Sequence, residues 1–335
     1  MKFKKYEKNP ILKPNPSNQW EELCVLNPAA IENDGKVYML YRAAGNDKTH
    51  LIHIGLAISS DGVNFTRQSD KPLISGDPNG LDAGGCEDPR LIKLGDYFYL
   101  TYASRPFPPG QYWREDKEYF GFKPEHGPKV LVWNNTLTHL AISKDLRNWK
   151  KLGPITDSHF DDRDVVIFPA KVQGKYFMLS RAMERCGDKY PNQNPAIWIS
   201  SSDDLLHWDN YSLLMEGKED WESKKIGAST PPILTKDGWL LLYHGVSSKD
   251  DAYRVGAVLL DKDDPTKILY RTKDFLMEPE EEYETNGYYN GCVFPTGIIR
   301  KGEDLYIYYG AGDKVICLAT VNENELLKFL KGESK

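Results

Sequence analysis

The sequence predicts an all-β protein, a five-bladed β-propeller with one short C-terminal helix. Two observations carry this prediction. One strand–turn–strand unit recurs five times along the 335 residues, and each copy holds an aromatic-rich strand beside a Gly, Asp or Asn turn. Units of about 60 residues with three or four short strands are typical of propeller blades, which cannot bury both sheet faces alone. A β-sandwich explains the strands but not the fivefold repeat.

The five copies share one internal order. A first strand leads through a turn into a second strand, and a third, apolar strand follows after a loop. Asp-Gly pairs at 34–35, 61–62 and 237–238 are hairpin signals, because glycine accepts a positive φ. The first and second strands fall at 27–42, 88–102, 166–181, 229–244 and 293–310, and the third strands at 54–61, 138–145, 196–203, 255–261 and 315–321.

Three segments lie outside the repeats of this predicted single domain, residues 1–335. Residues 1–26 form a polar, proline-containing lead-in, expected to wrap the outside or to complete a blade. Residues 105–135 interrupt the second unit as a long insert, and residues 323–332 show the apolar spacing of a helix. The insert's aromatics predict either a wall of a sugar site or a subunit contact: Tyr112, Trp113, Tyr119, Phe120, Phe122 and Trp133.

Composition narrows the functional classes. Hydrophobic residues make up 40% and charged residues 27%, as in ordinary globular proteins, and the net charge of −6 argues against a nucleic-acid binder. No run of 18 apolar residues and no signal peptide are found, so no membrane association is expected. Five scattered cysteines without CxxC pairs indicate free thiols in the cytoplasm and no metal site.

The candidate site follows from the repeat. In a propeller the first strands line the central channel, so polar residues at equivalent strand starts converge on one face. The strand starts present Asn27, Glu87, Asp88, Arg163, Asp164, Lys225, Ser229 and Asn290. The second strands end in Arg42, Arg181 and His244, and the hairpins supply Tyr253 and Asp313.

These residues separate by charge into an acidic pair, Glu87 and Asp88, and a cationic group. Several cations around one point need a negatively charged group that neutralises them. A carboxylate of the protein, Asp162 or Asp164, is one candidate, and a bound oxyanion such as phosphate or sulfate is the other. Matched positions in several repeats favour the oxyanion.

A carboxyl group beside an oxyanion pocket is the arrangement expected for inverting cleavage of a glycoside. Inverting cleavage of a glycoside needs one carboxyl to protonate the leaving oxygen and a nucleophile on the other face of the ring. A hydrolase needs a second carboxylate to activate water. A phosphorylase needs cations that place phosphate.

Several motifs make the chain resemble one family over roughly residues 7–330. They are Glu87-Asp88-Pro89-Arg90, Phe168-Pro169, Lys225–Ala228, Gly238–Val246, Leu260-Asp261 through Asp264-Pro265 to Leu269–Arg271, Pro279–Thr285, Val293–Pro295 and Tyr309–Asp313. This set resembles glycoside hydrolase family 130, five-bladed propeller enzymes that act on β-mannosides.

The resemblance implies an inverting phosphorylase that converts a terminal β-mannosyl unit and inorganic phosphate to α-mannose 1-phosphate, with no metal or organic cofactor. It implies that Asp88 is the catalytic acid, acting through the 3-hydroxyl of the mannosyl ring. The implied phosphate contacts are Arg163, Arg181, Lys225, His244 and Tyr253. The implied mannosyl contacts are Asn27, Arg42 and Asp313.

Three residues depart from the family pattern. Asp164 stands where many phosphorylases have Asn, Glu87 where some relatives have Tyr, and Ala170 where some have Arg. Glu87 and Asp164 are kept as substrate-binding candidates. A carboxylate at Asp164 weakens phosphate binding unless it points away, and Glu87 could raise the pKa of Asp88 through like charge.

Two rival functions remain. An inverting β-mannosidase would use Asp164, Glu222 or Glu282 as the base for water, and a non-catalytic propeller would only bind sugar. The linkage, the acceptor sugar and a possible homo-oligomer are left open by the sequence.

Overall fold

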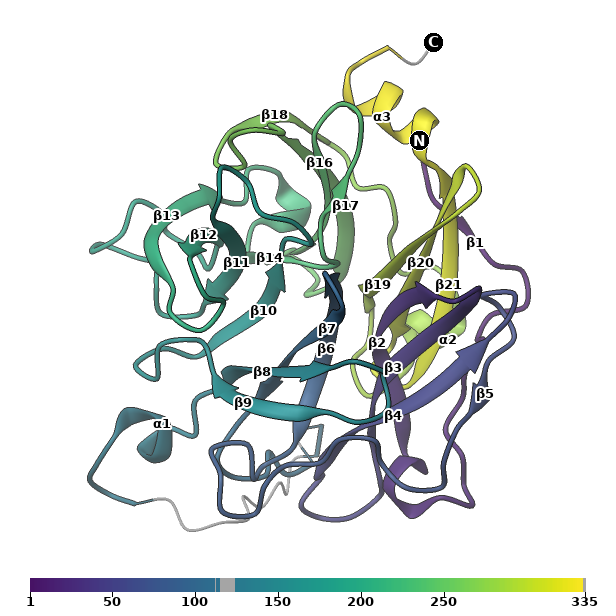
Figure 1. Cartoon of the computed structure of the whole chain (residues 1–335), viewed down its shortest axis with the longest axis vertical. Coiled ribbons are helices and arrows are strands. Elements are labelled where there is room, and N and C mark those ends of the chain that lie inside the picture. Colours follow the sequence, from purple (N-terminus) through teal and green to yellow (C-terminus); the bar gives the residue numbers. More distant parts are fainter. Residues whose placement is uncertain (112, 115–123, 334–335) are drawn as a thin grey trace.

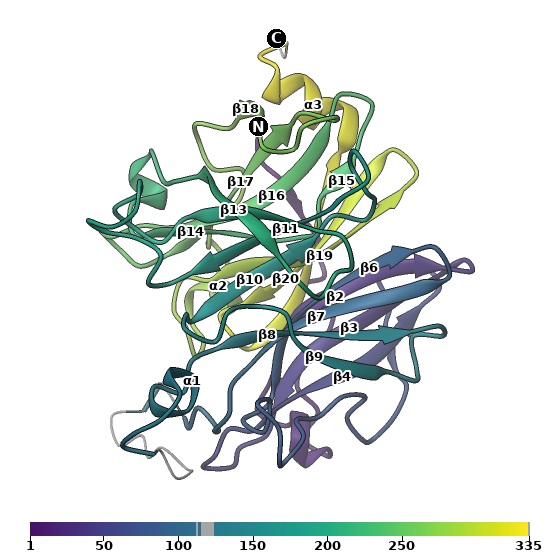
Figure 2. The same ribbon diagram turned by 60° about the vertical axis from the view of Figure 1, so that its left-hand side comes forward.

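The computed structural model describes residues 1–111, 113–114 and 124–333 and confirms the five-bladed β-propeller. Figure 1 shows the sheets following one another around the molecule in chain order, and Figure 2 shows the same blades turned by 60°. Each blade is an antiparallel sheet whose first strand is innermost, as the repeat predicts.

The first three blades have four strands each. Blade one comprises β2 (Cys24–Asn33), β3 (Lys36–Ala44), β4 (Ile52–Ser59) and β5 (Thr66–Arg67). Blade two comprises β6 (Cys86–Leu94), β7 (Tyr97–Ser104), β8 (Leu137–Ser143) and β9 (Lys150–Pro154). Blade three comprises β10 (Asp162–Ile167), β11 (Tyr176–Ala182), β12 (Ile197–Ser202) and β13 (Asp209–Met215).

The last two blades depart slightly from this plan. Blade four comprises β14 (Lys225–Ala228), β15 (Ile233–Leu234), β16 (Trp239–Val246), β17 (Tyr253–Leu260) and β18 (Ile268–Arg271). Blade five comprises β19 (Val293–Lys301), β20 (Asp304–Ala311), β21 (Val315–Asn322) and, from the other end of the chain, β1 (Lys4–Lys5).

The N-terminal residues close the ring. Strand β1 pairs antiparallel with β21, with Lys4 opposite Thr320 and Lys5 opposite Ala319. The lead-in therefore completes a blade, one of the two outcomes that the sequence allowed, although β2 begins at Cys24 and so takes in the end of the predicted 1–26 segment.

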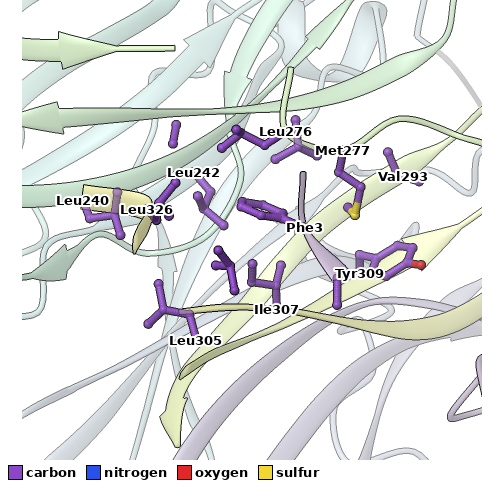
Figure 3. Packing of buried hydrophobic residues seen from close by; sticks show 14 of the residues in the cluster. Phe3, Leu240, Leu242, Leu276, Met277, Val293, Leu305, Ile307, Tyr309 and Leu326 are labelled. Atoms are coloured by element: carbon purple, nitrogen blue, oxygen red, sulfur yellow. The ribbon is translucent and has the colours of Figure 1, made fainter. Parts of the chain in front are cut away.

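Apolar side chains fill the spaces between neighbouring sheets. The cluster shown in Figure 3 joins blades four and five, and Phe3 lies at its centre beside Leu242, Leu276 and Ile307. A propeller blade buries both of its faces in this way, against the blade before it and the blade after it.

Helical segments are short in the described part of the chain. They are α1 (Lys129–Val132), α2 (Glu282–Thr285), α3 (Glu323–Leu330) and two 3-10 turns, η1 (Gln19–Glu21) and η2 (Asp220–Glu222). The predicted C-terminal helix is confirmed as α3, which is capped by the Asn322 side chain. None of these described helices has the length and apolar character needed to cross a membrane.

The long insert is described only in part. Residues 112 and 115–123 lie outside the described residues, and with them Tyr112, Tyr119, Phe120 and Phe122. Of the two described tryptophans, Trp133 is exposed, whereas Trp113 packs against His50 and Tyr288 at ring-centre distances of 4.8 and 4.7 Å. The choice between a sugar-site wall and a subunit contact therefore stays open.

Candidate active site

One cavity of ≈ 410 Å³ gathers the residues that the sequence singled out. It is lined by all eleven predicted site residues: Asn27, Arg42, Glu87, Asp88, Arg163, Asp164, Arg181, Lys225, His244, Tyr253 and Asp313. These residues come from all five blades, so the repeat places them correctly around one point. Of the eight residues named at the strand starts, Ser229 and Asn290 do not line the cavity.

A repeated backbone bulge aims three of these side chains. Asn27, Asp88 and Asp164 have φ of 46°, 51° and 55°. At each of them the pairing between the first and second strands shifts register. Asn and Asp adopt this left-handed conformation more readily than other non-glycine residues, which explains their presence at this one position of three blades.

Blades one and two form the acid wall of the cavity, which consists of Asn27, Arg42, Glu87 and Asp88. The Asp88 Oδ1 accepts hydrogen bonds from Asn27 Nδ2 at 2.7 Å and from Arg42 Nη1 at 3.0 Å. Burial opposes ionisation of Asp88, but Arg42, Arg90 and the Asn27 hydrogen bond outweigh it and hold the pKa below its ordinary value.

Glu87 is tied to two arginines. Its Oε2 lies 2.8 Å from Arg42 Nη1, and its Oε1 lies 3.2 Å from Arg105 Nη2. Arg42 therefore bridges Glu87 and Asp88. Arg105, at the start of the insert, also lines the cavity. The repeat did not single it out, because the residues directly after the second strands of the other blades are Gly45, Met183, Ser247 and Gly312, none of which is charged.

Blades three and four form the cation wall, which consists of Arg163, Arg181, Lys225, His244 and Tyr253. Its two arginines already have carboxylate partners. Asp161 accepts from Arg163 Nε and Nη2 at 2.5 and 2.9 Å, and Asp164 Oδ2 accepts from Arg181 Nε and Nη2 at 2.8 and 2.5 Å. Of the two neutralising carboxylates that the sequence suggested, Asp164 has this contact and Asp162 does not.

Lys225 is the cation of this wall that has no carboxylate partner among the described residues. Burial, together with Arg181 and Arg163, lowers its pKa to about 7, although Asp164 acts in the opposite direction. Its Nζ lies 5.2 Å from the centre of the Tyr253 ring, which stacks on His244 at 5.5 Å. An anion would relieve the repulsion among these cations.

His244 is neutral at ordinary pH. Burial lowers its pKa to about 4, even though Asp164 acts in the opposite direction. Its Nδ1 lies 3.2 Å from Ser229 Oγ, and its Nε2 faces Asp164 Oδ2 at 3.4 Å. Gly227 makes room for this pair, because a Cβ at that position would lie 2.3 Å from Asp164 Oδ2.

Arg90, two residues after Asp88, makes its hydrogen bonds to backbone oxygens. Its Nη1 donates to the backbone oxygen of Asp88 and its Nε to the backbone oxygen of Ser229, both at 2.7 Å. The guanidinium therefore holds the bulged backbone, and its Nη2 lies 3.8 Å from Asp164 Oδ1.

The two glutamates considered as bases for water lie away from the cavity. Glu222 caps η2 and pairs with Arg271 at 2.7 Å, and Glu282 is exposed at the start of α2. Asp164 is the one member of that trio that lines the cavity. In the described part of the chain, no three His, Cys, Asp or Glu residues gather in a way that could hold a metal ion.

Comparisons with known proteins agree with this geometry. The sequence profile of glycoside hydrolase family 130, described as β-1,4-mannooligosaccharide phosphorylase, matches residues 2–332. A 1,2-β-oligomannan phosphorylase of Thermoanaerobacter sp. (strain X514) is 35% identical, with 97% of this chain and 99% of the relative covered. A β-1,2-mannobiose phosphorylase of the same organism is also 35% identical, with 96% and 97% covered.

A solved structure is similar over the whole chain. The β-1,2-mannobiose phosphorylase of Listeria innocua, in complex with β-1,2-mannobiose, superposes with a TM-score of 0.80. It is 26% identical in sequence, and the match covers 99% of this chain and 100% of that one.

Proposed function

The chain belongs to glycoside hydrolase family 130, and we propose that it is an inverting β-mannoside phosphorylase. It cleaves a terminal β-mannosyl linkage with inorganic phosphate and releases α-mannose 1-phosphate and a shortened sugar. One observation carries the proposal: a single cavity brings the Asp88 carboxyl together with Arg163, Arg181, Lys225, His244 and Tyr253.

The proposed step uses the two walls for different tasks. A phosphate oxygen held by the cation wall bonds to the anomeric carbon, while the bond from that carbon to the glycosidic oxygen breaks on the other face of the ring. The leaving oxygen keeps the electron pair and takes a proton that originates from the Asp88 carboxyl. A bound phosphate raises the pKa of Asp88 by like charge, which offsets the opposite effect of Arg42.

The mannosyl unit is assigned to the acid wall and Asp313. Asn27, Arg42 and Asp313 offer both donors and acceptors to ring hydroxyls, and a pocket of ≈ 410 Å³ has room for a sugar ring and an oxyanion. No metal or organic cofactor is part of the proposal.

We further propose a β-1,2 linkage for the substrate. Two curated relatives at 35% identity and one solved structure that matches the full chain are phosphorylases of β-1,2-linked mannosides. The family profile is described by β-1,4-linked substrates, so a panel of β-1,2-, β-1,3- and β-1,4-mannobiose is needed to test the linkage.

The test measures mannose 1-phosphate and free mannose with and without inorganic phosphate. We expect mannose 1-phosphate from β-1,2-mannobiose only when phosphate is present. Free mannose formed at an equal rate without phosphate would identify a hydrolase instead. Arg181→Ala sharpens the distinction, because loss of a charged contact raises the phosphate KM of a phosphorylase by about 10- to 100-fold and leaves hydrolysis much less affected.

A further inference from the structure

Asp164 places a carboxylate inside the cation wall. Its side chain is only 4% exposed, yet it lines the cavity. The bulge at φ 55° turns it inward, and the small Gly227 leaves just enough space for its Oδ2. Because the Asp164 carboxylate packs so closely against β14, it forms part of the cation wall, which a bound phosphate would contact.

Cations and donors approach Asp164 from every neighbouring strand. They are Arg90 of β6, Arg163 of β10, Arg181 of β11, Lys225 of β14, His244 of β16 and Tyr253 of β17. Burial opposes ionisation of Asp164, but Arg181 and Arg90 outweigh it and hold the pKa well below its ordinary value. The carboxylate therefore stays ionised at neutral pH.

An ionised carboxylate accepts hydrogen bonds and donates none. An oxyanion oxygen beside it must therefore carry a proton, or the two negative oxygens repel each other without a hydrogen bond between them. Inorganic phosphate near neutral pH is a mixture of H₂PO₄⁻, with two P–OH donors, and HPO₄²⁻, with one, whereas sulfate is fully ionised and has none.

Resting on the phosphorylase function proposed above, we propose that Asp164 selects an oxyanion that carries a proton. Its carboxylate accepts a hydrogen bond from a P–OH group, while Arg163, Arg181 and Lys225 contact the oxygens that carry no proton. Asp164 is then a specificity residue. It admits phosphate and arsenate, which carry a proton at neutral pH, and it excludes sulfate, which does not.

Calorimetry with the anions alone tests this selection. Phosphate, arsenate and sulfate are titrated separately into the wild-type protein, without sugar, at one neutral pH. A single pH is used because Lys225 also titrates near neutrality, with a pKa of about 7. We expect wild-type protein to bind phosphate and arsenate similarly and sulfate about 10- to 100-fold more weakly.

Asp164→Asn keeps the side-chain shape but removes the charge and adds an N–H donor. We expect it to bind sulfate about 10- to 100-fold more tightly than wild type does, so that the preference for phosphate disappears. The matched control is Asp162→Asn, an identical change at a buried aspartate outside the cavity, and it should leave the order of anion affinities unchanged.

Two outcomes overturn the inference: wild-type protein that binds sulfate as tightly as phosphate, or a sulfate gain in Asp162→Asn and none in Asp164→Asn. If Asp164→Asn fails to fold, the wild-type titrations still decide. If no anion binds without sugar, sulfate inhibition of mannose 1-phosphate formation takes their place. Failure of the phosphorylase function is distinct, because no mannose 1-phosphate would then form from any mannobiose.

Discussion

At the scale of single residues, the cavity combines charges that each need a partner. Arg42 lies between Glu87 and Asp88, Arg105 adds a second cation beside Glu87, and Asp164 pairs with Arg181. A buried charge that loses its partner is strongly destabilising, so these pairs hold each other in place before substrate arrives. Substitution at one residue is therefore best checked both for activity and for folding.

Replacing Asp88 by Asn separates an enzyme from a sugar-binding propeller. We expect phosphorolysis to fall by about 10²- to 10⁴-fold, because an amide cannot supply the proton, while binding of β-1,2-mannobiose measured by calorimetry is retained. Asp203→Asn, at an exposed residue paired with Lys175, serves as the control and should keep wild-type turnover. Equal turnover in wild type and Asp88→Asn would remove Asp88 from its proposed role.

The sequence could not predict which of the two aspartates, Asp162 or Asp164, pairs with an arginine of the cavity. In a regular strand Asp162 and Asp164 would point to the same face, because side chains alternate with a period of two. The bulge between Arg163 and Val166 breaks that alternation, so that Asp164 lines the cavity and Asp162 does not. The same effect at the Glu87/Arg90 shift explains why Arg90 binds backbone rather than the Asp88 carboxylate.

At the scale of elements, the repeat predicted most of the fold. The turns after the third strands of blades one to three share a serine whose hydroxyl bonds an aspartate two residues later: Ser59 with Asp61, Ser143 with Asp145 and Ser202 with Asp204. The sequence pattern ended the third strand of the third unit at Asp203, one residue before the aspartate that accepts this bond, Asp204. The role of Arg105 at the start of the insert could not be predicted in the same way, because no other blade has a charged residue directly after its second strand.

The strand β1 gives an element-scale prediction. Phe3 is buried between blades four and five (Figure 3), whereas its neighbour Lys4 is exposed. We expect Phe3→Ala to lower the free energy of unfolding by about 3–5 kcal/mol, measured by chemical denaturation. Lys4→Ala should change it by less than about 0.5 kcal/mol. Similar values for the two variants would mean that Phe3 does not anchor the segment leading into β1 between blades four and five.

At the scale of the whole molecule, stability should depend on pH through buried histidines in three blades. Burial lowers the pKa of His50 to about 3, and those of His139 and His244 to about 4, from an ordinary value of 6.5. Below pH 6.5 these histidines bind protons in the unfolded chain but stay neutral in the folded chain. The free energy of unfolding therefore falls as the pH drops from 6.5 towards 4. Asp162, whose pKa burial raises to about 7, acts in the opposite direction.

The net effect is a loss of stability in mild acid. Each histidine contributes about 1.4 kcal/mol per pH unit and Asp162 offsets one of the three, which leaves a fall of roughly 3 kcal/mol per pH unit. Denaturant titrations at several pH values measure this slope. His139→Gln should reduce it by about a third to a half, and His159→Gln, at an exposed position, should not. A flat profile would contradict the prediction.

Closure of the ring by β1 also determines the order in which the blades can be completed while the chain is synthesised. The pairs within each blade join residues near in sequence, so blades one to four can form as the chain emerges. Phe3 and Lys5 instead await β21 and Glu284, which are separated from them by about 280 residues or more along the chain. The residues of β1 are thus made long before the strand with which they pair. Until that pairing forms, β21 is an open edge of blade five.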